Sequence, residues 1–147
     1  MRNFGLVLRK VIAYRLSSQN NNNLSINTFK DAFEIRNRHT DLCFHSDQGT
    51  NYTSHEYRDL IKALKVKQSF SSKANPYDNA VVESFFSNFK REEINHHSYE
   101  NFEELQESVK EYMNYYNDYR PHSSLKNKTP NQVENDYKLS VLAEPSV

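Results

Sequence analysis

The chain has 147 residues, and its 19 Lys and Arg balance its 19 Asp and Glu, so the formal net charge is zero. This excludes a protein that is basic over its whole surface, although one face can still be basic. With only 2 glycines, the Gly-rich loops of P-loop and dinucleotide-binding proteins are excluded. The single cysteine excludes an intrachain disulfide, and no run of about 18 apolar residues predicts a membrane span. We therefore expect one cytoplasmic domain, alone or with a small appendage, that needs no disulfide or metal to fold.

Strand and helix patterns alternate along the first part of the chain. Apolar runs with β-branched or aromatic residues predict short strands at 11–16, 42–44 and 66–70. Aromatic and aliphatic residues at helical spacing predict a helix at 23–38. Alternation of this kind predicts an α/β fold in which helices cover a sheet.

Two capping boxes predict where further helices begin. Thr53 and Glu56 stand three residues apart at the start of one amphipathic helix. Thr129 and Gln132 have the same spacing, and Pro130 between them suits the first position of a helix. We expect the last ten residues to form a frayed tail.

A helix with two unlike faces is predicted to begin near Asn79. One face is apolar and consists of Val82, Phe85, Phe86 and Phe89. The opposite face is polar and contains Glu83 and Lys90. Burying a Phe side chain stabilises a fold by roughly 1.5–3 kcal/mol, so the aromatic side fixes the direction in which Glu83 and Lys90 point. A longer helix, at 101–116, follows it.

Asp47 and Glu83 are the acidic residues best placed for chemistry. Asp47 follows the strand predicted at 42–44, and Gly49 lets the chain turn away from it. The 35 residues between Asp47 and Glu83 accommodate a helix, a strand and a loop, which can return the second acid to the first. Taken singly, each fits an ordinary solvated residue, whereas the pair predicts a site for a hard divalent cation such as Mg²⁺. Cys43 we interpret as part of the core.

Three segments of the chain together resemble the motifs of a known protein family. In chain order they read HSDQGTNYTS at 45–54, SKANPYDNAVVESFF at 72–86 and YYNDYRPHSSL at 115–125, the last followed by Thr129 and Pro130. This series resembles the catalytic core of bacterial insertion-sequence transposases of the retroviral-integrase type. The resemblance extends over about residues 9–137.

The resemblance implies an RNase H-like fold, in which helices flank a mixed sheet and a helical extension follows. It implies a DDE active site, where two aspartates and a glutamate hold two Mg²⁺ or Mn²⁺ ions for DNA 3′-end cleavage and strand transfer. Asp47 matches the second acid and Glu83 the third, so both are expected to be catalytic and to bind metal. Lys90, Lys73 and Arg91 are the expected contacts to DNA, which would be the transposon ends and the target.

The first aspartate of the family pattern is absent. Laying Arg9 on the arginine of the family's Asp-Leu-aromatic-Ser-Arg segment puts Gly5 at the aspartate, and the first acidic residue of the chain is Asp31. The aspartate-bearing strand and the usual N-terminal DNA-binding region would then precede Met1. We therefore expect weak metal binding, little or no strand transfer, and a sheet that is destabilised because residues 3–8 replace the lost strand only in part.

The resemblance predicts three parts: a shortened RNase H-like core at 1–98, a helical C-terminal part of that core at 99–137 and a tail at 138–147. Two functions then remain open. The chain is a transposase core that is inactive alone, or it is a non-catalytic DNA-binding or oligomerisation module that modulates a full-length transposase. An RNase H-type nuclease is disfavoured because the segment 116–130 matches transposases.

A basic stretch near the middle of the chain allows two interpretations. Between positions 58 and 73 the one acidic residue is Asp59, and the five basic residues are Arg58, Lys62, Lys65, Lys67 and Lys73. They form either a local nucleic-acid-binding face or the solvated face of a helix. A protein of this kind would be associated with the bacterial nucleoid, as a homo-oligomer or with a full-length transposase.

Overall fold

The computed structural model describes four stretches of the chain: 9–19, 21–38, 42–70 and 80–143. Ile12–Glu83 belong to one compact unit, and the other combines residues 84–143 with residues 9–11. Within these stretches, no helix is both long and apolar enough to cross a membrane.

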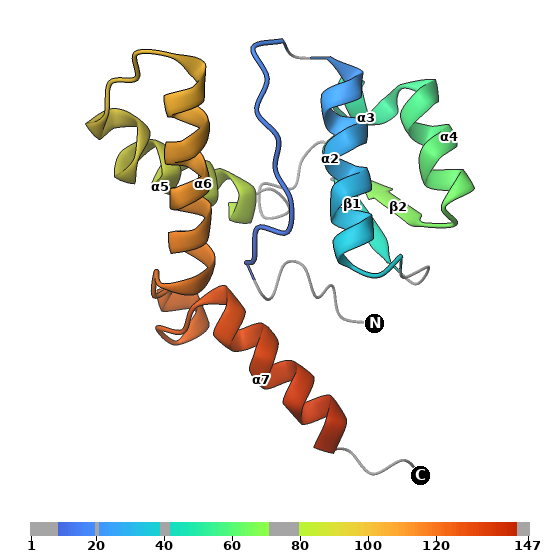
Figure 1. Ribbon diagram of the computed structural model, residues 1–147. Coiled ribbons are helices and arrows are strands. Elements are labelled where there is room, and N and C mark those ends of the chain that lie inside the picture. The colour runs from blue at the N-terminus through green and yellow to red at the C-terminus, as the bar shows by residue number, and fades with distance from the viewer. Residues whose placement is uncertain (1–8, 20, 39–41, 71–79, 144–147) are drawn as a thin grey trace. The chain divides into compact units, whose positions relative to one another are not determined.

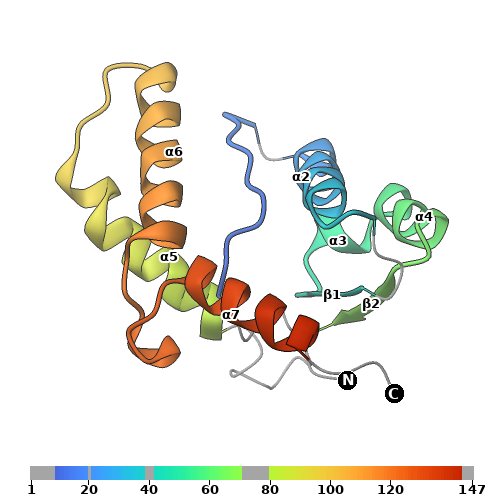
Figure 2. The same ribbon diagram turned by 60° about the horizontal axis from the view of Figure 1, so that its bottom comes forward.

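The first unit is a small sheet covered by helices. Its elements are α2 (Asn22–Ile35), β1 (Cys43–Ser46), α3 (Thr50–Thr53), α4 (His55–Ala63) and β2 (Lys67–Phe70). The two strands pair in parallel, with His45 opposite Ser69, and α3 and α4 form the crossover between them. Figures 1 and 2 show α2, α3 and α4 on the same side of this sheet. The predicted strand–helix–strand order is therefore confirmed in this unit.

Aromatic rings fill the space between these helices and the sheet. The ring of Phe29, on α2, lies 5.0 Å from that of Phe44 and 5.8 Å from that of Tyr57. Because side chains alternate along a strand, Phe44 facing this core turns Cys43 and His45 to the other side of β1. The interpretation of Cys43 as a core residue is therefore wrong, and its side chain is exposed.

The start of α4 differs by one residue from the predicted capping box. Ser54, not Thr53, is the N-cap, and its hydroxyl accepts a hydrogen bond from the Tyr57 N–H at 3.3 Å. Thr53 instead ends α3, where its own hydroxyl donates to the Gly49 carbonyl at 3.2 Å. The short helix α3 thus uses the residue that the sequence pattern assigned to α4.

The second unit consists of helices. Its elements are α5 (Ala80–Glu92, the first turn of which belongs to the first unit), η1 (Ile94–His96), α6 (Phe102–Asp118), η2 (Ser123–Leu125) and α7 (Pro130–Ala143). Ring contacts hold α5 against α6, with Phe85 lying 5.0 Å from Tyr116 and Phe89 lying 5.0 Å from Tyr112. Figure 1 shows α7 leading away from the lower end of α6.

The capping box predicted at the start of α7 is confirmed. The hydroxyl of Thr129 accepts from the Gln132 N–H at 3.2 Å, and the Gln132 side chain accepts from the Thr129 N–H at 2.9 Å. The helix then runs to Ala143, so residues 138–143 are helical and the expectation of a frayed tail there is wrong. An ion pair of 3.7 Å between Lys138 and Glu134, one turn apart, supports this part of the helix.

The strand predicted at 11–16 is wrong, because this segment has no regular secondary structure. Its first residue is nevertheless held as a strand residue would be. The side-chain amide of Asn117, on α6, accepts from the Val11 N–H at 3.0 Å and donates to the Val11 carbonyl at 2.9 Å. One carboxamide therefore satisfies both backbone groups that a neighbouring strand would otherwise bind.

Candidate active site

Asp47 lies at the end of β1, where the sequence placed it. Its side chain is exposed, and one carboxylate oxygen accepts a hydrogen bond of 2.9 Å from the Gly49 N–H. A Cβ atom added to Gly49 would stand 2.9 Å from the same oxygen, which is closer than such atoms approach. A residue with a Cβ at position 49 would therefore make the Asp47 carboxylate shift away from the Gly49 N–H.

Glu83 lies on the exposed face of α5. The exposed residues of this helix recur at helical spacing: Ala80, Val82, Glu83, Phe86, Ser87, Lys90 and Arg91. Glu83 and Lys90 thus share one face, as predicted. The prediction that Val82 and Phe86 lie on the buried face is wrong, since their exposed fractions are 55% and 52%. The ring contacts of α5 with α6 among the described residues come from Phe85 and Phe89 instead.

The predicted DNA contacts differ in their surroundings. Lys90 is exposed in the last turn of α5, whereas the Arg91 guanidinium donates to the Asn88 side chain at 2.8 Å and lies 3.5 Å from Glu92. Lys73 lies outside the described residues. The remaining members of the basic stretch are all exposed on α4, the following turn or β2: Arg58, Lys62, Lys65 and Lys67.

Asp47 and Glu83 both belong to the first compact unit. Each carboxylate is exposed, and each side chain can reach solvent and ligands. In the part of the chain that the structure describes, no group of three or more His, Cys, Asp or Glu side chains could hold a metal ion. Convergence of Asp47 and Glu83 on a shared cation remains a prediction.

A polar cluster on the outer face of the sheet lies beside the Asp47 turn. His45 Nδ1 lies 2.8 Å from the hydroxyl of Ser69 on β2, and the Cys43 thiol lies 3.6 Å from the same hydroxyl. These contacts join the two strands two and four residues before Asp47. The alternation of side chains along β1 is the signal that could have predicted this cluster.

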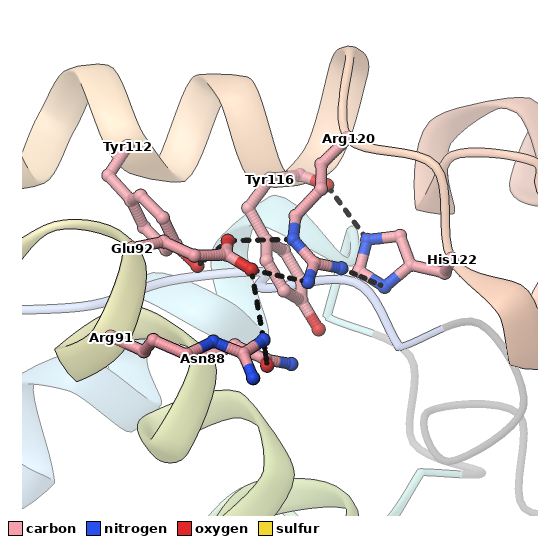
Figure 3. A network of polar contacts seen from close by, with 7 residues as sticks. All are labelled: Asn88, Arg91, Glu92, Tyr112, Tyr116, Arg120 and His122. Atoms are coloured by element: carbon pink, nitrogen blue, oxygen red, sulfur yellow. Dashed lines mark hydrogen bonds and ion pairs between the residues drawn. The ribbon is translucent and has the colours of Figure 1, made fainter.

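A polar network of the second unit joins α5 to the turn after α6 (Figure 3). The Arg120 guanidinium donates twice to the Glu92 carboxylate, at 2.6 and 2.8 Å, and the Tyr112 hydroxyl donates to it at 3.0 Å. The hydrogen bonds from Arg120, together with that from Tyr112, lower the pKa of Glu92 despite partial burial. Glu92 is therefore a carboxylate with a structural role, unlike the exposed Glu83.

His122 extends this network and is held in one neutral form. Its Nε2 lies 3.2 Å from the Tyr116 carbonyl, which can only accept, so Nε2 carries the proton. Its Nδ1 lies 3.4 Å from an Arg120 nitrogen, which can only donate, so Nδ1 is unprotonated. Burial is the main reason why the pKa of His122 is lowered. The segment 115–125 served in the sequence only to detect the resemblance, and the roles of Arg120 and His122 were not predicted.

Comparisons with known proteins agree with this arrangement. Two family models, both described as an integrase core domain, match residues 6–76 and 64–130. The product InsK of insertion sequence element IS150 of Escherichia coli is 40% identical over 126 residues, covering 86% of this chain and 44% of InsK. The transposase for insertion sequence element IS904 of Lactococcus lactis is 35% identical over 133 residues, covering 90% of this chain and 53% of that transposase. The chain thus spans about half the length of these curated relatives.

A solved structure has the same fold. The catalytic core domain of BIV integrase superposes with a TM-score of 0.62 at 17% identity, over 87% of this chain and 80% of that domain. The expected RNase H-like architecture of an integrase catalytic core is thereby confirmed. The chain belongs to the integrase core domain family, and its relatives there are insertion-sequence transposases.

Proposed function

We propose that the chain acts in DNA transposition, as the part of an insertion-sequence transposase core that holds the second and third acids, Asp47 and Glu83. The observation that supports this is that Asp47, an exposed carboxylate at a strand end, and Glu83, an exposed carboxylate on a helix, both stand at positions that match the family motif. Within this proposal we infer an RNase H-like core at 1–98, its helical continuation at 99–137 and a further segment at 138–147, the beginning of which still belongs to α7.

The family is generally dependent on divalent metal ions, and carboxylate oxygens are the ligands that Mg²⁺ and Mn²⁺ prefer. Asp47 and Glu83 provide such oxygens. However, the described residues include no cluster of three or more acidic, His or Cys side chains suited to a metal. Two carboxylates therefore do not fit a two-ion centre by themselves, and we infer weak metal binding with little or no strand transfer by the chain alone.

DNA binding is the part of this proposal that can be tested first. A short labelled duplex from the end of the mobile element that encodes the chain is titrated with protein, and fluorescence anisotropy reports binding. Replacing Lys90 or Arg91 by Ala should weaken binding and reduce the slope of log K against log salt by about 1 for each lost phosphate contact. Lys30→Ala, at an exposed position on α2, is the matched control. Absence of binding, or binding that is insensitive to salt, would contradict the proposal.

Catalysis is tested separately, with the same duplex and added Mg²⁺ or Mn²⁺. Cleavage by the chain alone should be far below that of a full-length relative. Equal turnover would contradict the inference that the carboxylate set is incomplete.

A second candidate function is modulation of a full-length transposase, and it is supported by the integrase core fold of the chain. Mixing the chain with an active relative and measuring excision distinguishes the two functions. Reduced excision supports this modulating role. Unchanged excision contradicts that role.

A further inference from the structure

Phe86 stands on the same exposed face of α5 as two residues of the proposed site. Glu83 precedes it by one helical turn, and Lys90 follows it by one turn. Its ring is 52% exposed, and its ring contact is with the neighbouring Phe85 at 5.3 Å. Phe85 instead packs against Tyr116 of α6, so the two adjacent rings point in different directions.

An aromatic ring as exposed as that of Phe86 contributes less hydrophobic burial to the stability of the chain than a buried ring does. An exposed Phe keeps apolar area in water, and Val82 beside it adds to this area with an exposed fraction of 55%. Among the described residues, the ring contacts between α5 and α6 are made by Phe85 and Phe89 and do not include Phe86. Phe86 is therefore available for an apolar face of a ligand, and the exposed Lys90 and Arg91 on the same helix are available for negative charge.

A DNA strand has these two properties. A helix rises about 1.5 Å per residue, so Phe86 and Lys90 are separated by about 6 Å along the axis. Stacked nucleotides follow one another at about 3.4 Å, so a base on the Phe86 ring and a phosphate at Lys90 would belong to nucleotides close together in one strand. Lys90 and Arg91 provide the charge that complements such a strand.

We propose that Phe86 stacks on an unpaired base at the end of the bound DNA, between Glu83 and the phosphate contact at Lys90. This inference rests on the proposed DNA-binding function and deepens it. An aromatic side chain stacks on any base, so Phe86 would favour opened DNA ends without selecting their sequence. It is a positioning residue, since it would hold the strand whose phosphate lies near Glu83.

The test uses the absence of tryptophan from the chain. The Phe86→Trp variant carries a single indole at this position, and the Phe102→Trp variant carries a control indole at another exposed Phe, 39% exposed on α6. Each variant is titrated with a duplex that has an unpaired terminal base and with the same duplex fully paired. Anisotropy of the labelled DNA reports binding, while indole emission reports contact.

Stacking predicts that the unpaired end quenches the indole emission of the Phe86→Trp variant and leaves that of the Phe102→Trp variant unchanged. Phe86→Ala should weaken binding of the unpaired end by roughly 5- to 150-fold and of the paired duplex much less. Phe86→Tyr should restore most of the affinity. Circular dichroism confirms that the variants are folded.

The outcomes separate this inference from the proposed function. Tight binding with no change in the indole emission of Phe86→Trp, or equal binding by Phe86→Ala, overturns the stacking role and leaves DNA binding intact. If the Phe86→Trp emission is blue-shifted without DNA and unchanged by it, the chain itself covers the ring, which also overturns the role. If neither duplex binds the natural chain, the proposed function fails and the inference fails with it.

Discussion

Glu92 and Arg120 are joined by two parallel hydrogen bonds of 2.6 and 2.8 Å, which tie the end of α5 to the turn after α6. Their side chains are 26% and 16% exposed, so solvent weakens this pair less than it weakens a surface ion pair. Because α5 also carries Glu83 and Lys90, the pair anchors the helix on which the proposed chemistry depends.

Replacing Arg120 by Lys should lower the free energy of unfolding by about 2 kcal/mol. Lysine keeps the charge but cannot make the paired hydrogen bonds to Glu92, and it loses the contact to His122. Urea unfolding measures the effect. Lys110→Ala removes an ion pair whose side chains are 60% and 61% exposed, and it should change the free energy by less than about 1 kcal/mol. Equal effects of the two substitutions would contradict an anchoring role for Arg120.

Stability should fall on acidification. The folded protein holds His122 neutral with a lowered pKa, so the unfolded chain binds more protons below the ordinary value of 6.5. The contribution of neutral His122 to the free energy of unfolding is present above pH 6.5 and is lost as the pH falls below that value. Glu92 has a lowered pKa too, so its contribution is lost further down, below the ordinary value of 4.5. The midpoint of urea unfolding should decrease between about pH 7.5 and about pH 5.5.

The substitution His122→Gln identifies the source of this pH dependence. Gln can still donate to the Tyr116 carbonyl but does not titrate, so its unfolding midpoint should change less over the same pH interval. A variant with the full pH dependence of the natural chain would assign the effect to other groups.

Tyr57 and Tyr112 should respond in opposite directions to the loss of a hydroxyl. Tyr57 has no exposed surface, and among the described residues its hydroxyl has no hydrogen-bond partner. Tyr57→Phe should therefore stabilise the protein by about 1 kcal/mol, whereas Tyr112→Phe loses the bond to Glu92 and should destabilise it by about 1 kcal/mol. Paired unfolding curves test this, and a destabilising Tyr57→Phe would show that the Tyr57 hydroxyl is bonded.

Gly49→Ala should destabilise the turn after β1 by about 1 kcal/mol, because the added Cβ would stand 2.9 Å from the Asp47 carboxylate. The cost should shrink when Asp47 is replaced by Ala as well. A double-mutant cycle measured by urea unfolding gives this coupling. Additive effects would show that the carboxylate does not constrain residue 49.

The elements that could be predicted from the sequence are those with local signals. The capping box at Thr129 and the helices bearing apolar residues at helical spacing are confirmed, because caps and amphipathic faces depend on residues close in sequence. The prediction of a strand at 11–16 is wrong because a strand needs a neighbouring strand to pair with. The Val11 backbone is instead hydrogen-bonded by the side chain of Asn117, 106 residues away.

In the candidate site too, some features follow from local sequence patterns and others depend on residues far away in the sequence. The places of Asp47, at a strand end, and Glu83, on a polar helix face, follow from local patterns. The direction of Phe86 could not be predicted, since Phe85 and Phe86 are equivalent in periodicity and only their packing against α6 tells them apart. The pairing of Glu92 with Arg120 spans 28 residues and depends on how α5 meets α6.

The bonds from Val11 to Asn117 and from Lys10 to Glu134 link positions 106 and 124 residues apart. During synthesis, the early residues leave the ribosome long before α6 and α7 exist to receive them. The helical unit can therefore close only after α6 and the start of α7 have been translated, and a nascent chain stalled before Asn117 would lack the partner that Val11 requires.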